Sequence, residues 1–93
     1  MLSINLTNIY KECVAIGLAR SKTDFSLRLL GRGRHYLRLI EQRGSMVSAA
    51  TTAALRLRLT EIAKRSPPAV ASEIHALVQS IDEAVQVSRV MRR

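Results

Sequence analysis

Apolar residues recur every three or four positions along most of the chain, which is the spacing of one face of an α-helix. The first such stretch runs from about Asn5 to Ile16, and Gly17 follows it as a residue that tolerates the left-handed backbone of a helix C-terminus. Its apolar positions are Leu6, Ile9, Tyr10, Cys13 and Ile16. No segment shows the alternation and β-branched enrichment of a strand. The pattern predicts an all-α fold.

Two short helices are expected in the middle of the chain, on either side of a glycine turn. Ser21 can cap the first helix, and Asp24 stands three positions later, where it complements the helix dipole. Gly31-Arg32-Gly33 permits a sharp reversal, because glycine adopts backbone conformations that other residues avoid. The second helix is expected from Arg34 to Arg43. Two short helices joined by a three-residue turn form a helix-turn-helix unit.

A longer helix is expected over Ala49 to Arg65, capped by Ser45 or Ser48. Its expected apolar side consists of Ala50, Ala54, Leu55, Leu59 and Ile62. Ser66-Pro67-Pro68 ends this helix and starts the next, because proline is tolerated in the first turn of a helix and not in its interior.

The last helix is expected from Pro68 to about Met91, and it is the longest. Its apolar stripe comprises Val70, Ile74, Leu77, Val78, Ile81, Ala84, Val85 and Ser88. A helix of this length spans ~30 Å or more, longer than a small core covers, so part of it is expected to meet a second copy. Packing on the chain's own helices is the alternative. The expected homodimer or homo-oligomer interface is Ile74, Leu77, Val78, Ile81 and Val85.

Composition and length restrict the class of protein. Ninety-three residues, 47% of them apolar, make one small folding unit. We interpret residues 1–66 as a helix-turn-helix domain of about four helices and residues 67–93 as a C-terminal helix for packing or dimerisation. One cysteine and two distant histidines give no disulfide and no metal site. No nucleotide-binding or hydrolase motif is present, so no enzyme activity, cofactor or small-molecule substrate is expected. Short apolar runs predict no membrane association and a cytoplasmic location. The net positive charge adds an expected association with the nucleoid.

Positive charge is concentrated in the middle of the chain. The net charge is +8, from 15 Lys and Arg against 7 Asp and Glu, and both ends of the chain are neutral. Residues 20–43 carry +5, from seven basic and two acidic side chains, and residues 44–66 carry the other +3. A basic surface on two short helices favours binding to phosphate. Only three aromatic residues are available to stack on single-stranded bases, so duplex DNA is the expected partner.

The segment from Ser21 to Gly44 resembles the phage-repressor helix-turn-helix family (Cro-like, XRE-type). The resemblance rests on Gly31 at the end of the first helix, Leu37 and Ile40 as apolar anchors of the second, and Glu41 after them. The chain is also similar to small uncharacterised alphaproteobacterial helix-turn-helix proteins that carry a Phe-Ser-x-x-x-Leu-Gly element followed by a Tyr-Leu pair.

The resemblance implies a sequence-specific, double-stranded DNA-binding transcriptional regulator that acts as a dimer or oligomer. In that family the second helix presents its N-terminal side chains to bases in the major groove. Carried over by position, the base contacts would be Arg34, His35 and Arg38, and the phosphate contacts Lys22, Arg32, Tyr36 and Arg43. Two alternatives stay open: a protein-interaction module of the antitoxin or anti-activator kind, and an architectural protein that coats DNA.

Overall fold

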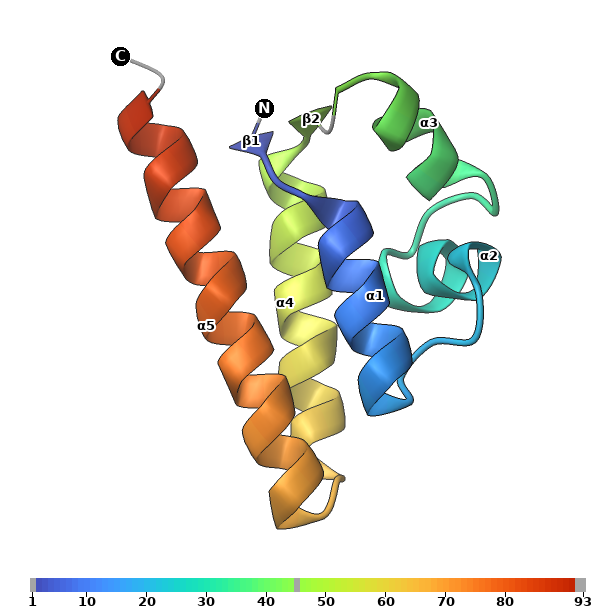
Figure 1. Ribbon diagram of the computed structural model, residues 1–93, viewed down its shortest axis with the longest axis vertical. Helices are drawn as coiled ribbons and strands as arrows, with labels where there is room; N and C mark the ends of the chain where they lie inside the picture. The colour runs from blue at the N-terminus through green and yellow to red at the C-terminus, as the bar shows by residue number, and fades with distance from the viewer. Residues whose placement is uncertain (1, 45, 92–93) are drawn as a thin grey trace.

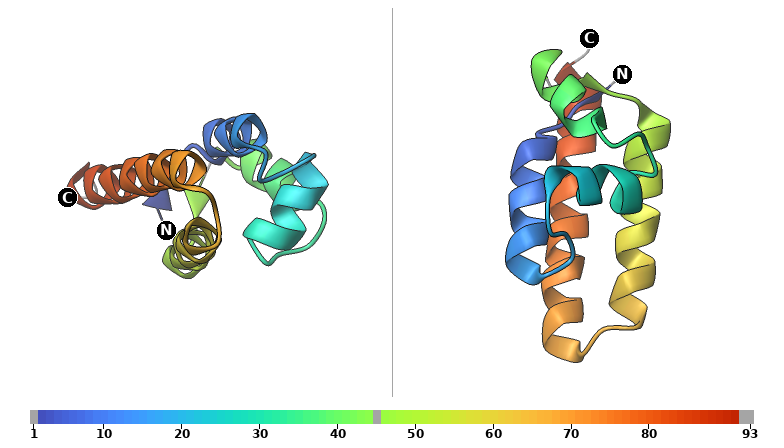
Figure 2. Two further views of the ribbon diagram at one scale, coloured as in Figure 1. Left: turned by 90° about the horizontal axis from the view of Figure 1, so that it is seen from below. Right: turned by 90° about the vertical axis from the view of Figure 1, so that its right-hand side faces the viewer.

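The computed structural model describes residues 2–44 and 46–91, and the prediction of an all-α fold is confirmed (Figure 1). The described elements are β1 (Leu2–Ser3), α1 (Leu6–Ile16), α2 (Lys22–Asp24), the π-helical turn η1 (Phe25–Leu29), α3 (Tyr36–Gln42), β2 (Met46–Val47), α4 (Ala49–Lys64) and α5 (Pro68–Met91). The molecule is flat, with extents of 39 × 28 × 19 Å. Helices α1, α4 and α5 lie side by side, and α2, η1 and α3 cover the side away from α5 (Figure 2).

Helix α1 begins and ends where its sequence signals predict. The side chain of Asn5 caps it by accepting a hydrogen bond from the Asn8 amide at 3.0 Å. Gly17 ends it with φ +94°, and its amide donates to the carbonyls of the last turn. Cys13 is fully buried on the inner face, which confirms it as a small core residue. Burial raises the pKa of its thiol to about 12, with a smaller contribution from neighbouring Glu12.

Helix α4 is capped by Ser48, whose hydroxyl accepts from the Thr51 amide at 3.1 Å; Ser45 lies outside the described residues. Its buried face differs in part from the prediction. Ala50 is exposed, whereas Thr51 and Thr52 are buried. The Thr51 hydroxyl oxygen accepts hydrogen bonds from Arg32 and Ser48, and the Thr52 hydroxyl donates to the Ser48 carbonyl, so both buried hydroxyls have partners. The buried residues of α4 are Thr51, Thr52, Leu55, Leu59 and Ala63, with Ala54 and Ile62 half-buried.

Helix α5 packs along α4 and α1 and so closes the core of its own chain (Figure 1). The predicted interface residues Ile74, Leu77, Val78 and Ile81 are 0–7% exposed. The prediction that these four residues contact a second copy was therefore wrong. Helix α5 buries them against α4 and α1, which lie along its length in the flat arrangement. Val85 is half-buried and lines a groove between α4 and α5. The described parts of the two predicted units, residues 2–44 with 46–66 and residues 67–91, thus share one hydrophobic core.

A short antiparallel pair joins the start of the chain to the start of α4. Leu2 pairs with Val47 and Ser3 with Met46. The sequence predicted no strand, since two residues are too few to show an alternating pattern. None of the helices described is both long and apolar enough to cross a membrane.

Candidate nucleic-acid interface

The helix-turn-helix segment has a longer connection than the sequence predicted. Ser21 caps α2 by accepting from the Asp24 amide at 3.1 Å, and the helix continues into η1. Gly31 then adopts φ +64°, and the Arg32 amide bonds back to the Ser26 carbonyl at 2.9 Å, which terminates the helix. The chain needs six residues, 30–35, to reach α3. The predicted helix start at Arg34 was therefore wrong.

Ser26 joins η1 to the start of α3. Its side chain is fully buried; the hydroxyl donates to the Lys22 carbonyl at 2.9 Å and accepts from the Leu37 amide at 3.1 Å. Leu37 is in the first turn of α3, where amides have no partner within the helix. One hydroxyl therefore caps α3 from a neighbouring element, in place of a local capping residue.

Glu41 joins α3 to α1 and α2. Its carboxylate accepts from the Thr7 hydroxyl at 2.6 Å and from Lys22 Nζ at 3.0 Å. These bonds hold the pKa of Glu41 below its usual range, the Thr7 bond being the largest cause. Lys22 was predicted to hold a DNA phosphate. The structure pairs its ammonium with Glu41, and the side chain stays 38% exposed, so the phosphate contact stays a prediction.

Arg32 joins the connection to the start of α4. Its Nε and Nη2 donate to Thr51 Oγ1 at 3.1 and 2.7 Å, and its guanidinium lies 5.7 Å from the centre of the Tyr36 ring. Both residues were predicted as phosphate contacts. The guanidinium lies between the ring and the buried Thr51 hydroxyl while Arg32 stays exposed, so both phosphate contacts stay predictions.

The outward surface of α3 and of the turn before it carries exposed cations. We call this surface the α3 face; it consists of Arg34, His35, Arg38, Leu39 and Arg43, all of them exposed. Among the described residues, no hydrogen bond or ion pair engages the side chains of Arg34, His35 or Arg43. Arg38 has only the electrostatic influence of Glu41. The DNA contacts predicted for these residues stay predictions, and the side chains that would make them are accessible.

Arginine and lysine side chains outside the α3 face are more often paired with a carboxylate. Arg28 pairs with Asp24 at 3.2 Å, and Arg56 pairs with Asp82 at 2.7 Å across α4 and α5. The Arg20 amide also donates to Asp24, and this bond is the largest cause of the lowered pKa of that carboxyl. Most carboxylates near the basic segments are thus engaged by other groups, so they do little to reduce the charge of the α3 face.

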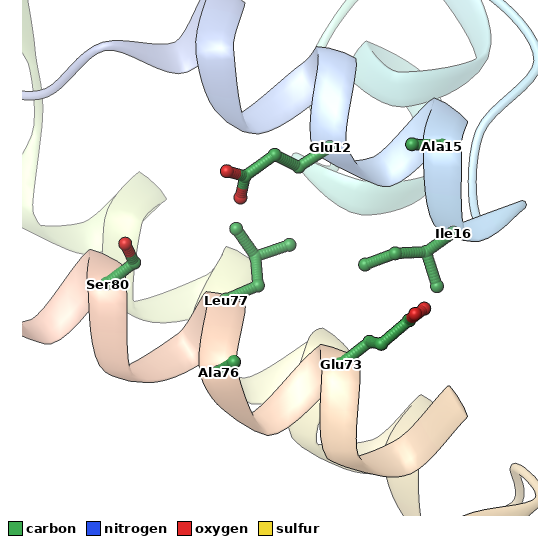
Figure 3. A pocket seen from close by; sticks show the side chains of 7 residues that line it. All are labelled: Glu12, Ala15, Ile16, Glu73, Ala76, Leu77 and Ser80. Carbon is green, nitrogen blue, oxygen red and sulfur yellow. The ribbon is translucent and has the colours of Figure 1, made fainter. Parts of the chain in front are cut away.

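A groove of about 420 Å³ lies between α1 and α5, and its charge has the opposite sign. Glu12 projects from α1 and Glu73 from α5, on either side of Ile16 and Leu77 (Figure 3). No lysine or arginine lines this groove. The two carboxylates make this groove unfavourable for a polyanion, and the groove lies on the side of the molecule away from α2 and α3 (Figure 2).

Within the part of the chain that the structure describes, no three His, Cys, Asp or Glu side chains gather in a way that would hold a metal ion. In comparisons with known proteins, a family described as a family of unknown function (DUF6626) matches residues 6–91. No curated protein and no solved structure matches the chain.

Proposed function

We propose that this chain, which belongs to the DUF6626 family, binds double-stranded DNA through the α3 face as a transcriptional regulator. The observation that carries the proposal is a set of exposed cations on one short helix and its preceding turn, with the local carboxylate Glu41 already bound to Thr7 and Lys22. A rigid, positively charged protrusion suits a groove lined by phosphates.

The three arginines of the α3 face suit this role by their chemistry. A guanidinium donates two parallel hydrogen bonds to a phosphate or to the major-groove edge of guanine. Arg34 and Arg43 lie near the two ends of α3, and Arg38 lies between them. In the proposed complex α3 enters the major groove, and His35 and Arg38 reach base edges. Arg43 holds a phosphate as predicted, and Arg34, predicted as a base contact, also holds a phosphate because it lies before the start of α3.

The way α3 is attached to the rest of the protein supports this proposal. Three polar joints hold it to the body of the protein: the Ser26 hydroxyl, the Glu41 carboxylate and the Arg32 guanidinium. A helix fixed in this way loses little conformational freedom on binding. Lys22, Arg32 and Tyr36 act in the proposal by positioning α3. The proposal includes no dimer contact, because four of the five residues predicted for it are in the core and Val85 is half-buried.

Binding that coats DNA without a preferred sequence is the second candidate. Leu39 is 44% exposed in the middle of the α3 face, where a base-reading polar side chain would be expected. Leucine can contact only the thymine methyl group. This feature favours an architectural protein, and competition between duplexes of different sequence distinguishes the two candidates.

The test is a fluorescence anisotropy titration of a labelled duplex of about two helical turns over a range of NaCl concentrations. The two phosphate contacts of Arg34 and Arg43 predict a slope of log K against log salt of about −1.8. Arg38→Ala is expected to weaken binding ~5–10-fold, whereas Arg56→Ala, which removes the same charge from the α4–α5 ion pair, should leave affinity nearly unchanged. Equal effects of the two substitutions, or no binding at low salt, would contradict the proposal.

A further inference from the structure

A second group of arginines lines a cleft between η1 and the second half of α4. The cleft has a volume of about 220 Å³, and no residue of α3 contributes to it. We call it the η1–α4 cleft, and it is lined by Arg28, Leu29, Arg58, Glu61, Ile62 and Arg65. Leu29 is buried and Ile62 is half-buried, so the cationic side chains surround apolar walls. Cations beside apolar surface are less well hydrated, which strengthens their attraction for an anion.

Arg58 is fixed in position before any ligand arrives. Its Nη1 donates to the Arg28 carbonyl at 3.1 Å, which uses one of the five N–H donors of the guanidinium. The guanidinium also lies directly against Gly31, where a Cβ atom would come within 2.6 Å of both terminal nitrogens. The missing side chain at Gly31 therefore creates the space that Arg58 occupies. A donor group held in this way loses little freedom when it binds an anion.

The two other arginines add charge to the same cleft. Arg28 is tethered by Asp24 at 3.2 Å, and Arg65 stands at the C-terminus of α4, where its guanidinium has no hydrogen bond or ion pair with the described residues. Glu61 is the one acidic residue in the lining, and Lys64 lies 3.5 Å from its carboxylate. Positive side chains in the lining outnumber negative ones by two. A phosphate group carries about −1.5 to −2 at neutral pH, which matches that excess.

We propose that the η1–α4 cleft is a binding site for a phosphate group, with Arg58 as its fixed donor and Arg65 as the arginine that closes on the ligand. The phosphate can belong to a small phosphate ester or to the backbone of the bound duplex, since both present the same oxygen atoms. The proposal does not rest on DNA binding by the α3 face, because the two surfaces share no residue.

The experiment is a ¹⁵N NMR titration of the full chain with inorganic pyrophosphate at constant ionic strength, with sodium chloride as the matched control. Saturable shift changes are expected in residues 28–31 and 58–65, including the Arg58 and Arg65 side chains. Arg65→Gln should weaken pyrophosphate binding about fivefold, because it removes a charged donor from an exposed position without disturbing the fold. Glu61→Gln should strengthen it, and Arg56→Gln should leave it unchanged.

Shift changes that chloride reproduces would overturn the proposal, as would equal pyrophosphate affinities for the wild type and Arg65→Gln. The duplex titration identifies the source of the phosphate. If Arg65→Gln also weakens duplex binding, the DNA backbone fills the cleft; if it weakens pyrophosphate binding alone, the ligand is a small phosphate ester. Pyrophosphate binding without any duplex binding would support the cleft and reject DNA binding by the α3 face, so the two proposals can fail separately.

Discussion

Ser26→Ala tests whether a buried hydroxyl fixes the position of α3. The substitution removes one oxygen and leaves the packing nearly unchanged, so its main effect falls on the two hydrogen bonds of that oxygen. The Lys22 carbonyl keeps a partner, because it also accepts from the Phe25 amide. The Leu37 amide loses the hydroxyl that accepts its hydrogen bond.

The expected magnitude follows from these partners. A buried donor without an acceptor costs about 1–3 kcal/mol, and the better helix propensity of alanine returns up to ~0.5 kcal/mol. The net loss in the free energy of unfolding should be about 1–2 kcal/mol, measured by urea denaturation. In a domain of this size each kcal/mol corresponds to about 4–8 °C in Tm.

Ser66→Ala is the matched control for this prediction. The Ser66 hydroxyl also donates to the carbonyl four residues earlier, at 2.7 Å from the Ile62 oxygen, and the structure shows no donor directed at Ser66 Oγ. Its removal should change stability by a few tenths of a kcal/mol. If Ser26→Ala were no more destabilising than Ser66→Ala, or if the Leu37 amide kept its protection from hydrogen exchange, the reasoning about this joint would be refuted.

Three further predictions concern the backbone, pH and the thiol. Gly31→Ala and Gly17→Ala should both lower Tm because both positions have positive φ, and the Arg58 guanidinium against Gly31 should add little because it ends a flexible side chain that can move aside; an unchanged Tm in both variants would contradict this. The Thr7 bond is the largest cause of the lowered pKa of Glu41. The stabilisation that this carboxylate contributes is complete above its ordinary pKa of 4.5 and is lost as pH falls through its lower pKa in the folded state. Urea midpoints measured from pH 6 to 3 should therefore decline less in Glu41→Gln. Cys13 should resist thiol reagents at pH 8 until urea unfolds the chain; rapid labelling of the native protein would show that it is accessible.

Local signals were enough to place most helix boundaries from the sequence. The helix after Ser48 starts there because a serine side chain satisfies its first amides, and the helix after Pro67 starts there because proline fits only a first turn. Gly17 and Gly31 ended their helices with positive φ as expected. These choices depend on neighbouring residues, which the sequence displays directly.

Contacts between distant residues were not predictable from the same patterns. The family resemblance pointed to Glu41 as a position of the motif. Its hydrogen-bond partner Thr7 lies 34 positions away and could not be read from local spacing. Arg32 was predicted as a phosphate ligand, and its hydrogen bonds to Thr51, 19 positions away, could not be read from the local sequence. Ser26 gave the one usable signal: a small polar residue within an apolar helix face indicates a buried hydrogen bond.

Binding of duplex DNA at the α3 face can be located by a ¹⁵N NMR titration of the protein with a duplex at low salt, followed residue by residue. Shift changes are expected to be concentrated in residues 34–43 and to weaken as salt is added. Changes confined to the α1–α5 groove around Glu12 and Glu73, or none at all, would contradict it.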